Sequence, residues 1–257
     1  MDVRVLFEDE LRRRGVSFTM EVESGRQVVQ VGDVRLLVSL DQLQREVAGD
    51  GDGGRVSRFV DTVLASAAES PGELSADRLY WCLEPGDYEE PADYRVALSK
   101  RADRVLVHLS SDDRLVTWVT PAMLSVLGLS ESEAGARAFT NLGCALSQAT
   151  IEIKDVDGVQ LGFINTSLPF KAALILAPNL CEVAGTLLGW PLLAVVPDRD
   201  FLYLWAARHK DFAQRVGGVV VHEYLHAADP ISTEVYELTD LGLRAIGEFP
   251  TGSKGNP

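Results

Sequence analysis

The residues with the clearest chemical potential are His222, Glu223 and His226, which form the pattern His-Glu-x-x-His in the segment VVHEYLHAAD. On a helix, residues four positions apart lie on the same face, so the two histidines could hold one zinc ion together. Glu223 would then act as a general base on a zinc-bound water, whose pKa the metal lowers to about 7. The pattern alone predicts a zinc-dependent hydrolase of the peptidase type.

The helix around the motif favours a different interpretation. At about 100° per residue, its positions divide into two faces. The apolar face contains Ala213, Val216, Val220, Tyr224 and Ala227, and the opposite face contains Asp211, Arg215, Gly218, His222 and His226. Both histidines therefore share a face with charged residues, which is typical of solvent-exposed side chains.

A catalytic zinc site of this type also needs a third protein ligand. The candidates are His209 before the helix and Glu234, Glu237, Asp240 and Glu248 after it. Of these, Glu248 lies at the most suitable distance along the chain. We therefore take His222, His226 and Glu248 as the candidate metal ligands.

Two other groups of residues are candidates for binding. Arg199 and Asp200 follow an apolar strand in VVPDRDFLYL, where a guanidinium could bind a carboxylate or phosphate through two hydrogen bonds. The favoured alternative is a buried Arg199–Asp200 pair that holds the turn. Trp81, Tyr88 and Tyr94 flank an acidic, proline-interrupted loop and could form an aromatic lip for a partner, or else pack into the core.

The elements that position these residues alternate irregularly between strand and helix, which is typical of an α+β fold with mixed or antiparallel sheets and packed helices. Residues 1–75 form a small α+β unit with a helix over 2–14, three strands and a helix over 55–69. Residues 76–250 form the main α+β domain, and we expect residues 251–257 to be a disordered tail.

Within the main domain, a hairpin is expected around Asp157-Gly158, because this pair suits a two-residue turn. Helices are expected over residues 167–176 and 178–189, followed by two strands around the turn at 197–200. The HEYLH motif falls on a helix over 211–227, which Asp229-Pro230 ends.

Charge and apolar patterning limit the classes of partner. With 24 Lys and Arg against 38 Asp and Glu, the net charge of −14 repels a polyanion, so nucleic acid is not expected as a partner. The N-terminus lacks the apolar core of a signal peptide. The longest apolar stretch is interrupted by Pro178, Asn179, Glu182 and Pro191, which indicates two buried elements and no membrane partner. We therefore expect a cytoplasmic protein.

Two long blocks of the main domain read RLVTWVTPAMLSVLGLSESEAGARAFTNL and SLPFKAALILAPNLCEVAGTLLGWPLLAVVPDRDFLYL. The first resembles the strand, short helix and longer helix of the YtpQ-like family of bacterial proteins, a domain family of unknown function. The second resembles that family's paired helices and its strands around a Val-Pro-x-Arg-Asp turn. HAADPISTEVYEL resembles its closing segment, so the likeness covers residues 100–248. The resemblance implies an ordinary amphipathic helix at HEYLH and supplies no catalytic residues.

Together these patterns predict an acidic, cytosolic, non-catalytic protein that binds another protein and uses no cofactor. The alternative is a zinc-dependent hydrolase in which His222, His226 and Glu248 hold the metal and Glu223 is the general base.

Overall fold

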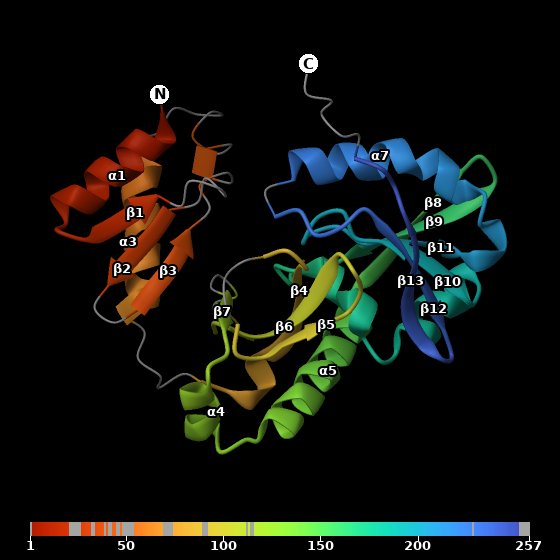
Figure 1. Cartoon of the computed structure of the whole chain (residues 1–257), viewed down its shortest axis with the longest axis horizontal. Coiled ribbons are helices and arrows are strands. Elements are labelled where there is room, and N and C mark those ends of the chain that lie inside the picture. Colours follow the sequence, from red (N-terminus) through yellow and green to blue (C-terminus); the bar gives the residue numbers. More distant parts are fainter. Residues whose placement is uncertain are drawn as a thin grey trace. The chain divides into compact units, whose positions relative to one another are not determined.

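The computed structural model describes residues 2–20, 27–31, 34–38, 40, 43–44, 47, 54–68, 74–88, 92–111, 113, 116–227 and 229–251 (Figure 1). The chain divides into two compact units, Met1–Glu73 and Leu74–Pro257, close to the boundary expected near residue 75. Every strand pairing described is antiparallel, and helices pack on the sheets, so the α+β class is confirmed. Of the tail expected over residues 251–257, residues 252–257 lie outside the described residues.

The described residues of the first unit include a three-stranded sheet and the helices that pack on it. Its elements are α1 (Val3–Arg13), β1 (Ser17–Met20), β2 (Gln27–Val31), β3 (Val34–Val38) and α3 (Gly54–Ala68), with strand order β1-β2-β3. Asp2 begins α1 by accepting a hydrogen bond from the amide of Arg4, and Gly15, with a φ of 69°, follows its end. Phe7 and Phe59 join the two helices, with ring centroids 5.9 Å apart.

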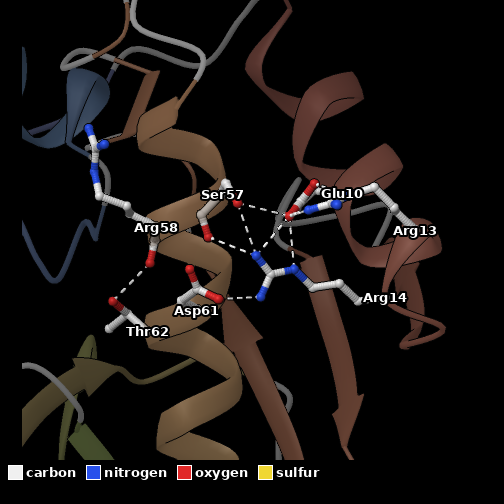
Figure 2. Close-up of polar contacts among 7 residues, drawn as sticks. All are labelled: Glu10, Arg13, Arg14, Ser57, Arg58, Asp61 and Thr62. Atoms are coloured by element: carbon white, nitrogen blue, oxygen red, sulfur yellow. Dashed lines mark hydrogen bonds and ion pairs between the residues drawn. The ribbon is translucent and has the colours of Figure 1, made fainter.

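A polar cluster also joins α1 to α3 (Figure 2). The carboxylate of Glu10 accepts hydrogen bonds from Arg13, from Arg14 and from the hydroxyl of Ser57. Arg14 also contacts α3 directly, through its ion pair with Asp61. The guanidinium of Arg13, then that of Arg14, holds the pKa of Glu10 at about 2, below its usual value near 4.5.

This shift predicts how pH affects the helix pair. A depressed carboxyl pKa stabilises the folded state fully above about 4.5, and this stabilisation is lost as the pH falls through about 2. In an NMR titration of the carboxyl carbon, Glu10 is expected to titrate near 2, and Arg13→Gln should raise that pKa. Arg12→Gln is the matched control, because Arg12 pairs with Glu8 and Asp9 instead. Equal responses to the two variants would contradict the assignment of the shift to Arg13.

The second unit contains a smaller sheet with strand order β4-β6-β5, in which β7 also pairs with β6. These strands are β4 (Leu79–Pro85), β5 (Arg95–Ala97), β6 (Ala102–Leu109) and β7 (Val116–Trp118). After them come α4 (Pro121–Leu127), which ends at Gly128 with a φ of 65°, and α5 (Glu131–Gln148), which a Ser130–Glu133 capping box begins. α5 packs against β4 (Figure 1).

The larger sheet of this unit has six strands in the order β13-β12-β10-β11-β9-β8. Its elements are β8 (Thr150–Val156), β9 (Val159–Asn165), β10 (Leu192–Val195), β11 (Tyr203–Ala206), β12 (Glu234–Thr239) and β13 (Gly242–Glu248). Alternate side chains divide its two faces: Leu193 and Trp205 pack toward α7 (Phe212–His226), and Leu192 and Leu204 join the core shared with the smaller sheet. Figure 1 shows α7 lying across the first of these faces.

The segment between β9 and β10 is helical within both ranges expected for helices, but with narrower bounds and a different helical geometry. It forms a 3-10 helix over Lys171–Leu176, a π-helical turn over Cys181–Gly185 and a short α6 (Thr186–Leu188). Ala177 is extended, with a ψ of 128°, because Pro178 disfavours the helical conformation of the residue before it. Within the described residues, no helix has both the length and the apolar character needed to cross a membrane.

Candidate functional site

The HEYLH motif lies in the last turns of α7, with its histidines on the exposed side. Val220 is fully buried against the sheet, while His222 and His226 are exposed, as the helical phase predicts. The two imidazole rings lie 4.2 Å apart between centroids. Nδ1 of His226 lies 2.7 Å from the carbonyl oxygen of His222, which can only accept, so Nδ1 carries the proton.

Glu223 lies on a different side of the helix from the histidines. It is half-buried, and its charge acts on the hydroxyl of Tyr203 in β11. Burial of Tyr203, then the negative charges of Glu223 and Asp198, raises the pKa of Tyr203 to about 12. The carboxylate-bearing residue of the motif is therefore less exposed than both of its histidines.

The expected third ligand, Glu248, is paired with an arginine. Its Oε2 accepts a hydrogen bond of 2.9 Å from Nε of Arg101, and together with Tyr224 it lines a cavity of about 360 Å³. In the parts of the chain that the structure describes, no three His, Cys, Asp or Glu side chains group as metal ligands. Zinc binding stays a prediction, and the zinc content of the purified wild-type protein and of the variant His222→Ala/His226→Ala tests it.

Arg199 forms a buried ion pair, but with a different partner from the one expected. Its Nη2 donates to both carboxylate oxygens of Glu84 in β4, at 2.9 and 3.1 Å, and its Nη1 lies 3.6 Å from Asp229 after α7. Asp200 instead donates its backbone amide to the carboxylate of Asp198. Burial alone would lower the pKa of Arg199, but Glu84 and then Asp229 raise it above its ordinary value, so Arg199 remains charged.

The three aromatic residues do not form one exposed lip. Trp81 is 5% exposed, donates its indole N–H to the carbonyl of Gly135 in α5, and belongs to the core. Tyr88 is half-buried and contacts Trp118 edge-on, with ring centroids 5.4 Å apart. Tyr94 packs against the same core from the side of β5. Core packing is therefore correct for Trp81, and a lip that includes it is wrong.

Sequence reasoning did not single out β8, the strand at one end of the six-stranded sheet. All seven of its residues pair with β9, from Thr150 with Asn165 to Val156 with Val159. On its other side, no strand among the described residues pairs with it. Six of its seven side chains are exposed, including Ile153 and Val156 at 37% each. The hairpin expected around Asp157-Gly158 was the sequence feature that could have identified this strand.

The hairpin register shows which amides of β8 face outward. Asp157 and Gly158, with φ of 52° and 80°, form a two-residue turn, so Val156 and Val159 are the hydrogen-bonded pair that closes it. Hydrogen-bonded and non-hydrogen-bonded pairs alternate in an antiparallel ladder. The outward amides and carbonyls of β8 therefore belong to Ile151, Ile153 and Asp155.

The charged side chains next to this edge turn back toward β9. Lys154 places its ammonium 5.0 Å from the ring centroid of Phe163 and 3.5 Å from the carboxylate of Glu152. Glu152 in turn accepts a hydrogen bond from Asn165. Charged side chains, lysine above all, commonly protect an exposed strand edge, but these two are directed across the sheet face. Among the described residues of the second unit, these two side chains leave the outer backbone of β8 uncovered.

Comparison of the chain with protein-family models, with curated proteins and with solved structures finds no match in any of the three. The resemblance to the YtpQ-like family therefore stays a prediction from the residues that carry it.

Proposed function

We propose that this chain is a non-catalytic cytoplasmic protein of the YtpQ-like kind that binds an extended segment of another protein along β8. The observation that supports the proposal is the outer edge of this strand, along which the amides of Ile151, Ile153 and Asp155 point away from β9 at every second residue. An added strand would gain main-chain hydrogen bonds from the edge, and side-chain contacts would select its sequence.

The exposed side chains of β8 set the character of the partner segment. Ile153 and Val156 offer apolar contacts, one on each face of the strand, because successive side chains alternate. The net charge of −14 favours a neutral or basic segment over an acidic one. The proposal therefore specifies a neutral or basic segment with apolar residues that alternate between the two faces.

The sharpest test removes one outward amide without disturbing the hairpin. Ile153→Pro eliminates an N–H that the ladder to β9 does not use, and proline is tolerated on edge strands in this position. Ile153→Ala keeps the N–H and removes the exposed side chain, so it is the matched control. We expect the wild type and Ile153→Ala to capture a partner protein from a lysate. Ile153→Pro should capture at least tenfold less of it.

Circular dichroism of each variant verifies that the fold is kept. Equal capture by Ile153→Pro and the wild type would contradict binding along this edge. Loss with Ile153→Ala as large as with Ile153→Pro would show that the side chain, and not the backbone edge, is what the partner binds.

A further inference from the structure

A polar groove of about 530 Å³ lies in the second unit, between α5, β4 and the residues that follow β9. Its walls include Tyr80, Arg137, Asn141, Gln148 and Thr166. This volume is within the roughly 300 to 1,000 Å³ typical of ligand sites, and none of the residues predicted from the sequence as a site lines it.

The charges at the groove compensate one another. Arg78 forms an ion pair with Asp113 and also donates to the backbone carbonyls of Leu109 and Ser110. Arg137 lies 3.6 Å from the carboxylate of Asp77. Each arginine of the groove is thus matched by an aspartate, and the groove favours a neutral ligand over an anion or a cation.

The floor of the groove carries a hydroxyl without a partner. Tyr80 is 9% exposed, and its ring is held edge-on by Phe170, with centroids 5.6 Å apart. Tyr80 lines the groove, and among the residues that the structure describes no group hydrogen-bonds to its hydroxyl. Burial raises the pKa of Tyr80, so the hydroxyl stays protonated and can donate.

Asn141, which lines the same groove, provides an acceptor. Its Nδ2 donates to the carbonyls of Ala76 and Leu79, at 3.0 and 2.7 Å, and this fixes the orientation of the amide because carbonyls only accept. Asn141 is 8% exposed, and its Oδ1 has no donor in the described part of the chain. A nearly buried donor and a nearly buried acceptor therefore line the same groove.

From this pair we infer that the groove binds a neutral carboxamide, the side chain of a glutamine or asparagine, whose carbonyl accepts from Tyr80 and whose NH₂ donates to Asn141. A carboxylate would match Tyr80 but would face the Oδ1 acceptor without a proton to donate. An ammonium ion would match Asn141 but would lie among paired arginines.

The inference rests on the proposed function, because the groove adjoins the start of β8. Gln148 of the groove wall is two residues before Thr150, the first residue of β8. Thr166 of the opposite wall directly follows Asn165, which pairs with Thr150. A partner segment along β8 that continues past Thr150 would bring its next side chains to the groove.

The test uses blocked tripeptides and the full-length protein. Acetyl-Gly-Gln-Gly-amide is titrated by NMR against acetyl-Gly-Glu-Gly-amide and acetyl-Gly-Leu-Gly-amide. We expect the glutamine peptide to bind most tightly, with the shifts centred on Tyr80 and Asn141. Tyr80→Phe should weaken it about fivefold, the loss expected for one neutral hydrogen bond, without reducing stability. Tyr94→Phe, a half-buried tyrosine outside the groove, should leave the affinity unchanged.

Equal affinity of Tyr80→Phe and the wild type, tighter binding of the glutamate peptide, or absence of binding by all three peptides would overturn the inference. The Ile153→Pro variant separates this failure from failure of the proposed function. Ile153 does not line the groove, so this variant should bind the glutamine peptide like the wild type even though it captures no partner.

Discussion

Replacing Glu84 with leucine is expected to lower the free energy of unfolding of the second unit by about 3 to 5 kcal/mol. Glu84 is 3% exposed and accepts two hydrogen bonds from Arg199, so its removal leaves a buried guanidinium without its main counter-charge. Asp229, at 3.6 Å, compensates only in part. Urea unfolding followed by tryptophan fluorescence measures this change in the second unit alone, because all four tryptophans lie in it.

Two controls separate the ion pair from the loss of a side chain. The double variant Glu84→Leu/Arg199→Met should be more stable than Glu84→Leu, since apolar side chains can replace a buried pair at little cost. Glu248→Leu removes an exposed pair with Arg101 and should cost less than about 1 kcal/mol. A double variant as unstable as the sum of its single variants would contradict a coupled pair.

Trp205→Ala is expected to destabilise the second unit by about 3 to 5 kcal/mol, because it opens a large cavity between β11 and α7. Trp205 is fully buried, and its indole contacts Phe212 at the start of α7, with ring centroids 5.8 Å apart. The three remaining tryptophans report the unfolding transition, and their fluorescence in urea gives the change in free energy.

Trp205→Phe should cost less than about 2 kcal/mol. The buried indole N–H has no hydrogen-bond partner among the described residues, so the substitution also removes an unsatisfied donor, which offsets part of the lost contact. A phenylalanine variant as unstable as Trp205→Ala would contradict this account and would indicate that the N–H is satisfied in solution.

Local chemistry allowed part of the fold to be predicted. The hairpin at Asp157-Gly158 and the turn at 197–200 follow from turn residues between apolar runs, and both strand pairs form there. β4 could not be found by alternation, because its first six residues are all buried and both faces are covered. The helices expected over 167–176 and 178–189 form with narrower bounds and other geometries, as a 3-10 helix over Lys171–Leu176 and as a π-helical turn over Cys181–Gly185 that α6 continues, because apolar content does not distinguish these helix types.

The position of a candidate site residue could be predicted only where a single helix or strand determines which way its side chain points. The phase of α7 places His222 and His226 outward from the sequence alone. The partner of Arg199 lies 115 residues away in β4, so no local pattern could reveal Glu84 in place of Asp200. Tyr80 and Asn141 likewise come to line one groove only through the packing of α5 on β4, and it is only when the other contacts of the described residues are known that their polar atoms without a partner become apparent.

Amide hydrogen exchange of β8 tests the open edge most directly. In the free protein we expect alternation along the strand: the amides of Ile151, Ile153 and Asp155 exchange fast, and those of Glu152 and Lys154, bonded to β9, exchange slowly. When a captured partner is added, the three fast amides should become protected while the slow ones change little. Uniform exchange along β8 in the free protein, or fast amides that stay fast in the complex, would contradict partner binding at this edge.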